Sequence, residues 1–96
     1  MTKNIAQIII SGTLVNDPQF YNLKNKSGKL SALFIKTEID NNQKRFFRVL
    51  TNNPELQKIV MKLKKNNSVT VSGSPYPKLY NEKLSIEVSA DNIIIN

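Results

Sequence analysis

The sequence predicts an all-β domain with one helix, built as a closed five-stranded Greek-key barrel. Three observations support this prediction. Apolar and polar residues alternate along several short segments, as they do in strands that bury one face. Turn-forming Asn, Asp, Gly and Pro residues separate these segments. One segment, between the third and fourth predicted strands, instead has the apolar spacing of a helix.

The predicted strands span about residues 5–15, 30–39, 44–50, 68–74 and 83–90, with a short extended piece at 20–23. On each strand, alternation predicts one set of inward side chains. These sets are Ile8, Ile10, Gly12 and Leu14; Leu33, Ile35 and Thr37; Phe47, Val49 and Thr51; and Leu84, Ile86 and Val88. Ala32, Phe34, Lys36 and Glu38 are predicted on the outer face of the second strand.

Two segments beyond the fourth strand complete the β prediction. Residues 75–80 are extended but contain two prolines, which lack backbone donors and suit the edge of a sheet. Asn81-Glu82 is predicted to form a tight turn, and residues 93–95 a terminal segment.

The helix is predicted from its capping residues and from one apolar stripe. Asn53 suits the N-cap, Pro54 the first helical position and Glu55 the positive end of the helix. The stripe recurs at helical spacing and consists of Leu56, Ile59, Val60 and Leu63. Lysines occupy the other side, and Asn66-Asn67 is expected to stop the helix.

This order of elements, three strands, a helix and two strands, fits the OB-fold. In that fold, ligands bind to the face of the second and third strands. They also contact the loops between strands one and two and between strands four and five. We therefore predict one domain over residues 1–96, with its binding site on that face.

Composition narrows the classes of function. The formal charge is +7, from 14 basic and 7 acidic residues, which is typical of a small domain that binds a polyanion. The chain has no cysteine and no histidine, so disulfides, thiolate chemistry and histidine ligands are excluded. The acidic residues are dispersed and no glycine-rich phosphate loop is present, so we expect no enzyme activity, metal or cofactor.

The start of the chain lacks a secretory signal, and no stretch is long enough to span a bilayer. We therefore expect a cytoplasmic protein without a membrane partner.

The third predicted strand interleaves basic and aromatic side chains and is the best indication of function. Alternation places Phe46 and Arg48 on one face and Phe47 on the other, with the core residues. An exposed ring beside a guanidinium group suits stacking on a base while a phosphate is held. We predict that Phe46 and Phe34 are base platforms and that Arg48 and Lys36 are phosphate partners.

Further candidate contacts lie on the loops and strand ends that border this face. Three lysines lie on a mobile loop between the first and second strands, where sequence-independent phosphate contacts are expected. Alternation points Arg45 away from the binding face, although at the strand end it could still reach a phosphate. The cationic candidates are Lys24, Lys26, Lys29, Arg45, Lys78 and Lys83. The aromatic candidates are Tyr21, Tyr76 and Tyr80.

Three segments carry a resemblance to a known family. They are residues 8–18, with an apolar run, a glycine and Asp-Pro; residues 46–49, Phe-Phe-Arg-Val; and residues 65–73, from the helix end to a glycine. In order and at these spacings they resemble the single-stranded DNA-binding protein (SSB) family of bacteria, their phages and organelles. Phe46 stands where that family places a base-stacking aromatic, and Tyr80 where it has another aromatic contact.

The resemblance implies binding of single-stranded DNA, with little sequence preference, in DNA replication, recombination or repair. It also implies a homo-oligomer, either a dimer or a tetramer, and a gene carried by a bacterium or by a phage or plasmid. Because the sequence ends at Asn96, directly after the predicted barrel, we do not expect the acidic tail through which bacterial members recruit repair and replication proteins. Asn52 also stands where some members have a further stacking aromatic.

Two alternatives remain open at this stage. One is a tailless accessory protein of the primosomal type, acting mainly through a helicase, primase or polymerase, so replication proteins are a further candidate partner class. The other is an RNA-binding OB module similar to the cold-shock proteins. The opening strand and the Phe-Phe-Arg-Val strand argue against the RNA-binding alternative.

Overall fold

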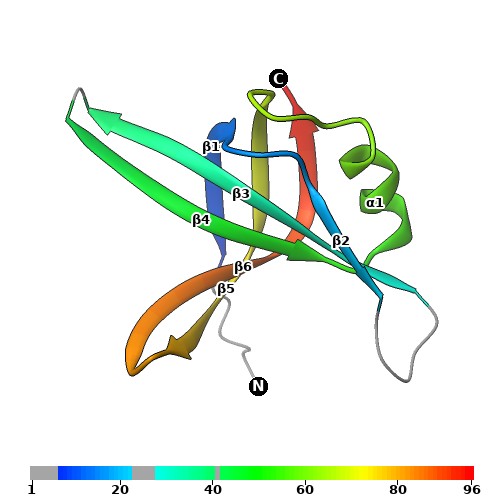
Figure 1. The fold of residues 1–96 in the computed structure, drawn as a ribbon. Coiled ribbons are helices and arrows are strands. Elements are labelled where there is room, and N and C mark those ends of the chain that lie inside the picture. Colours follow the sequence, from blue (N-terminus) through cyan, green and yellow to red (C-terminus); the bar gives the residue numbers. More distant parts are fainter. Residues whose placement is uncertain (1–6, 23–27, 41) are drawn as a thin grey trace, which may run out of the picture.

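The computed structural model describes residues 7–22, 28–40 and 42–96. Within these residues the chain forms six strands and one α-helix (Figure 1). In order, the elements are β1 (Ile8–Leu14), β2 (Gln19–Asn22), β3 (Lys29–Asp40), β4 (Gln43–Thr51), α1 (Pro54–Val60), β5 (Ser68–Tyr80) and β6 (Lys83–Ile95). The beginning of the first predicted strand, before residue 7, lies outside the described residues.

The strands form a closed barrel. The sheet order is β1-β5-β6-β4-β3-β2, and a further pairing between β1 and β3 closes β1, β5, β6, β4 and β3 into a ring. This closing contact places Thr13 opposite Lys36 and Leu14 opposite Ile35. β2, the extended piece predicted at 20–23, pairs with β3 beside the barrel. The predicted all-β, five-stranded barrel with one helix between the third and fourth barrel strands is therefore confirmed.

Two hairpins extend from the barrel as arms (Figure 1). β4 pairs with β6 in parallel, from Arg48 opposite Glu87 to Leu50 opposite Ser89. Beyond this short contact the β3–β4 and β5–β6 hairpins diverge, and each continues as an antiparallel pair. Some side chains of both arms line a common hollow at the barrel's edge.

The β5–β6 arm differs from the sequence prediction in two respects. The inward positions predicted for Leu84 and Ile86 are wrong, because these side chains are 67% and 50% exposed, whereas Val88 is fully buried. Alternation separates an inner face from an outer one only where a second layer covers the strand, and the outer part of the arm has left the barrel. The fourth strand also continues to Tyr80 instead of ending near Ser74.

The turn and the prolines of this arm lie as expected. Asn81 and Glu82 both have positive φ, at 49° and 65°, as in the tight turns that join antiparallel strands. Within the described residues β5 pairs with β1 only as far as Gly73. Among the described residues, no strand pairs with this edge of β5 at Pro75 and Pro77, which is the edge position that prolines require.

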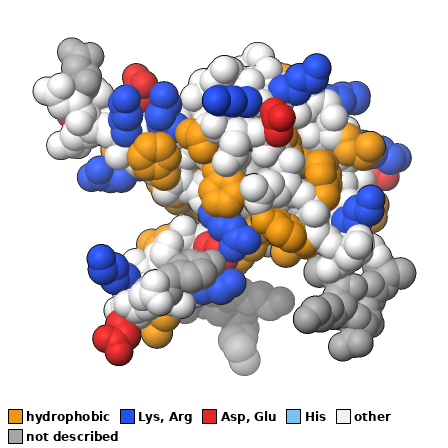
Figure 2. All heavy atoms as spheres, in the orientation of Figure 1, with side chains coloured by type: hydrophobic (Ala, Val, Ile, Leu, Met, Phe, Trp, Pro, Cys, Tyr) orange, Lys and Arg blue, Asp and Glu red, His pale blue; other side chains and the backbone are white. Residues whose placement is uncertain are grey.

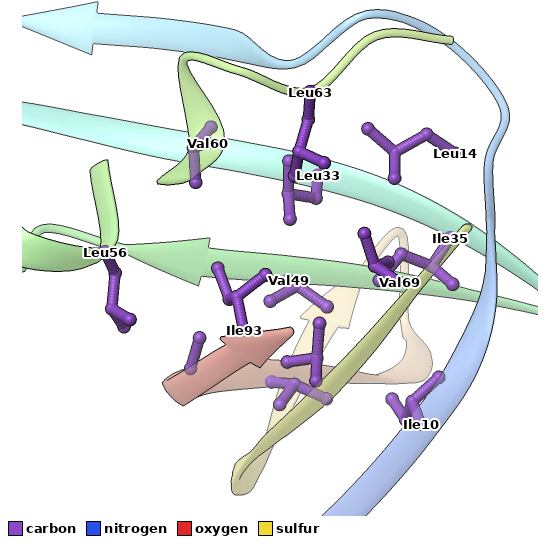
Figure 3. Packing of buried hydrophobic residues seen from close by; sticks show 13 residues of the cluster. Ile10, Leu14, Leu33, Ile35, Val49, Leu56, Val60, Leu63, Val69 and Ile93 are labelled. Atoms are coloured by element: carbon purple, nitrogen blue, oxygen red, sulfur yellow. The ribbon is translucent and has the colours of Figure 1, made fainter. Parts of the chain in front are cut away.

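A compact apolar core fills the barrel (Figure 3). Ala32 is also fully buried, although alternation predicted it on the outer face. It lies opposite Gln19 on β2 and Leu50 on β4, whose longer side chains flank its methyl group. The core cluster consists of Ile10, Leu14, Leu33, Ile35, Val49, Leu56, Val60, Leu63, Val69, Val71, Val88, Ala90 and Ile93.

The helix begins as predicted and ends earlier. Asn53 is the N-cap, and its side-chain oxygen accepts a hydrogen bond of 2.8 Å from the backbone N–H of Glu55. The α-helix ends at Val60, and Leu63 reaches the core through a tighter turn in which its N–H donates to the Val60 carbonyl at 3.0 Å. In the part of the chain that the structure describes, no helix is long and apolar enough to cross a membrane.

Substitution of Gly12 tests the closing contact of the barrel. A Cβ atom at this position would overlap the carbonyl oxygen of Lys36 and lie 2.8 Å from Cγ2 of Ile35. We therefore expect Gly12→Ala to lower the free energy of unfolding by about 1–3 kcal/mol, because β1 must move away from β3. Urea unfolding measures this change. Ser89→Ala, at an exposed position of β6, is the control, with an expected change below about 0.5 kcal/mol.

Candidate nucleic-acid interface

Strand register aligns basic and aromatic side chains on one face of β2, β3 and β4. Because directly opposite residues of paired strands point to the same side, each facing pair shares this face. The pairs are Tyr21 with Leu30, Phe34 with Arg48, and Lys36 with Phe46. Along the β3–β4 arm, Lys and Arg side chains lie next to hydrophobic ones (Figure 2). This is the face that the sequence predicted for ligand binding.

The phenylalanines of this region divide as alternation predicted. Phe46 is 67% exposed, on the outer face. Phe47, on the opposite face of β4, is half-buried and packs against the core cluster. Phe34 is half-buried rather than fully exposed, beside Arg48. Phe46 therefore offers the larger free ring surface to a ligand.

A hollow of about 490 Å³ lies where the two arms diverge. We call it the fork. Beyond the contact between β4 and β6, its walls come from β4 and β3 on one side and from β6 on the other. The volume is in the range of small-molecule sites, and aromatic and aliphatic groups form much of its lining. The lining residues are Phe34, Phe46, Phe47, Arg48, Ser85, Ile86 and Glu87.

A buried ion pair forms the floor of the fork. Nη1 of Arg48 lies 2.6 Å from Oε2 of Glu87, whose side chain is only 2% exposed. Nζ of Lys78 lies 3.8 Å from the other carboxylate oxygen of Glu87. The guanidinium carbon of Arg48 is 5.9 Å from the centroid of the Phe34 ring, a distance typical of a cation–π contact. Arg48 therefore contacts both the carboxylate of Glu87 and the ring of Phe34.

Sequence reasoning missed Glu87. Alternation in the last strand placed Ile86 and Val88 inside, which left Glu87 among the solvent-facing residues. Its burial comes from the parallel pairing of β6 with β4, which a one-dimensional pattern does not contain. The available signal was weak: an acidic residue of the same parity as Lys83 and Ser85, on a strand bordering the predicted site.

The remaining predicted cations lie around this centre rather than in it. Nζ of Lys36 is 3.8 Å from Oε1 of Glu38, and the side chain of Lys36 is 32% exposed. Arg45 is exposed, and its register opposite Thr37 places it on the face away from Phe46, as predicted. Lys83 is exposed at the outer end of the β5–β6 arm.

Of the remaining predicted contacts, Lys29 lies in a different element than expected, and some others lie outside the described residues. Lys29 is the first residue of β3 and not part of a loop, although it is exposed. Tyr21 is 43% exposed on β2, and Tyr76 is half-buried on the same face of the β5–β6 arm as Glu87. Lys24, Lys26 and the side chain of Tyr80 lie outside the described residues.

A metal site has no basis in residues 7–22, 28–40 and 42–96. These residues contain no group of three or more His, Cys, Asp or Glu side chains that could hold a metal ion. The chemistry that the face offers is apolar stacking combined with positive charge.

The structure is similar to those of several single-stranded DNA-binding proteins, although no protein-family model and no curated protein matches the sequence. It is similar to the SSB of Plasmodium falciparum in complex with ssDNA, with a TM-score of 0.81, 18% identity and coverage of 100% of this chain and 98% of that one. It is similar to the mitochondrial single-stranded DNA-binding protein Rim1 of S. cerevisiae, with a TM-score of 0.80, 12% identity and 96% coverage of each chain.

A third similar structure is the SSB domain of a protein from Synechococcus sp., with a TM-score of 0.77 and 13% identity. The match covers 97% of this chain and 98% of that one. At these identities the similarity shows the fold, so the chain has the OB-fold of the SSB proteins along its whole length.

Alanine substitution separates the structural phenylalanine from the exposed one. We expect Phe47→Ala to lower the free energy of unfolding by about 1–3 kcal/mol, below the usual cost for a fully buried ring because Phe47 is half-buried. Phe46→Ala removes a ring that is 67% exposed, so the expected change is below about 0.5 kcal/mol. Urea unfolding of both variants measures the difference. A larger loss for Phe46→Ala would show that its ring supports the fold.

Proposed function

We propose that this protein binds single-stranded DNA, with little sequence preference, in DNA replication, recombination or repair. One observation carries the proposal: the exposed ring of Phe46 lies opposite Lys36, beside Phe34 and Arg48, on the face by which OB-folds bind their ligands. The similarity to SSB structures, one of them a complex with ssDNA, supports it.

The proposed mechanism combines stacking with charge. Bases stack on Phe46 and on the groups that line the fork, which any base can do because every base has a π-face. Lysines around the face, such as Lys36 and Lys83, neutralise phosphates and release counterions. Stacking on the protein removes bases from pairing, so binding opens secondary structure in the strand and involves no chemical reaction.

We also propose a homo-oligomer, a dimer or a tetramer. Within the described residues, one edge of β1 pairs with β5 along Ile8 to Thr13, whereas its other edge pairs with β3 only at Thr13 and Leu14. The remaining open edge carries Ile9, which is 69% exposed. An open strand edge beside an apolar side chain favours association with another copy.

A second candidate function is a replication-accessory protein that acts mainly through a helicase, primase or polymerase. The observation that favours it is the apolar face of the β5–β6 arm, where Leu79 lies opposite Leu84 and the two are 70% and 67% exposed. Pull-down with and without nuclease separates the candidates. Replication proteins retained after nuclease, and lost with Leu79→Ser, would favour the accessory role.

The direct test is fluorescence polarisation with labelled single-stranded DNA, duplex DNA and single-stranded RNA of equal length, over a salt series. We expect single-stranded DNA to bind most tightly, and its affinity to fall as salt rises. A clear preference for RNA would favour an RNA-binding module instead. No affinity for single strands even at low salt would contradict the proposal.

Phe46→Ala tests the stacking surface. We expect affinity for single-stranded DNA to fall by about 1–3 kcal/mol, because the ring that carries a base is removed. Phe20→Ala is the matched control, since Phe20 is 43% exposed on β2 but alternates with Tyr21 and so lies on the opposite face. Equal losses in the two variants would rule out a specific platform at Phe46.

The oligomer is tested by substitution of the exposed residue on the β1 edge. We expect Ile9→Lys to lower the mass measured by light scattering, because it replaces an apolar contact with like charges on two copies. Ile94→Lys, at a comparable exposure of 53% on β6, is the control for an added lysine. An unchanged mass for Ile9→Lys would contradict an interface at this edge.

A further inference from the structure

A buried carboxylate lies inside the proposed binding face of a chain that carries a net charge of +7. Glu87 is 1% exposed, and its carboxylate is the floor of the fork. A negative charge at this place opposes the binding of a polyanion, so its presence requires an explanation. Its contacts supply one, because Arg48 from β4 and Lys78 from β5 both lie within ion-pair distance of it.

The ion pair restricts what Arg48 can bind. Its Nη1 is 2.6 Å from Oε2 of Glu87, and the carboxylate is almost wholly excluded from water. If Arg48 moved to a phosphate, the buried carboxylate of Glu87 would lose the cation that lies 2.6 Å from it, which is strongly unfavourable. A phosphate brought to Arg48 in place would instead lie close to the negative charge of Glu87. Both arrangements oppose a phosphate at the floor of the fork.

The same contacts suit a base at this position. A guanidinium group is planar, weakly hydrated and able to stack, and bases stack on arginine planes as well as on aromatic rings. Nη1 of Arg48 is paired with the carboxylate of Glu87, and the guanidinium carbon lies over Phe34, 5.9 Å from the ring centroid. The exposed ring of Phe46 borders the same hollow.

We propose that Glu87 is a positioning residue that withdraws Arg48 from phosphate binding and holds its guanidinium group as a flat platform for a base in the fork. This inference rests on the proposed function and assigns Arg48 a role different from the phosphate contact that the sequence predicts. Phosphates are left to cations outside the floor, such as Lys36, which is 3.8 Å from the 60% exposed Glu38.

The salt dependence of binding tests this assignment. For single strands, each phosphate that the protein neutralises adds about 0.7 to the slope of log affinity against log salt. All proteins in the test carry Lys78→Gln. Without this substitution, Glu87→Gln would also release Lys78, which could then neutralise a phosphate and change the slope. We expect Glu87→Gln to steepen the slope by about 0.7, because the freed Arg48 then binds a phosphate. This is an extra loss of about fivefold for each tenfold rise in salt.

The double substitution Arg48→Gln with Glu87→Gln keeps the prediction testable if a lone substitution impairs folding. It replaces the ion pair with two amides that can bond to each other. We expect this variant to keep the salt slope of the Lys78→Gln parent, because no phosphate contact is lost. We expect its affinity to be several-fold weaker, because the guanidinium platform for a base is lost. Glu55→Gln is the control for net charge, since Glu55 is an exposed helix residue paired with Lys58 at 3.6 Å, and we expect it to keep the parental slope.

Three outcomes would overturn the inference. The double variant could flatten the slope by about 0.7, which would show that Arg48 already binds a phosphate. Glu87→Gln could leave the slope unchanged, or Glu55→Gln could steepen it equally. In each case the protein still binds single-stranded DNA, whereas the proposed function fails only if the unsubstituted protein does not.

Discussion

The short parallel contact between β4 and β6 is the interaction on which both the fold and the site depend. It spans three residues on each strand, from Arg48 opposite Glu87 to Leu50 opposite Ser89. On its inner side it brings together Val49 and Val88, both buried in the core. On its outer side it brings together the Arg48–Glu87 ion pair. The same strand pairing therefore contributes to the barrel wall on one side and forms the floor of the fork on the other.

The same contact explains why the site lies at the edge of the barrel. Each hairpin continues beyond it as an antiparallel pair, and the arms diverge because nothing pairs β4 with β6 past Arg48 and Glu87 among the described residues. Divergence opens a hollow between the strands, and the residues just outside the contact line it. A ligand in the fork therefore touches both arms, so its affinity depends on how the barrel sets their separation.

The site belongs to a strongly basic chain, but a buried carboxylate within it pairs with one of its cations. The chain is basic overall, yet the cation nearest the centre of the fork is held by a buried carboxylate. Charge at the periphery and stacking groups at the centre form a pattern suited to single strands, whose phosphates lie outside and whose bases can turn inward. A cation count taken from composition alone does not reveal that Arg48 and Lys78 both lie within ion-pair distance of Glu87.

The order of the elements indicated the barrel. Patterns along the chain predicted the individual strands and the helix, the placement of Phe46 and Phe47 on opposite faces, and the cap at Asn53. These features are local, because alternation, helical spacing and capping involve neighbours along the chain. The exposure of Leu84 and Ile86, the burial of Ala32 and the burial of Glu87 beside Arg48 became evident only from the arrangement of the strands in space. Burial at those positions depends on which distant strand lies alongside, and the identical alternating pattern is compatible with a strand inside the barrel or an arm beyond it.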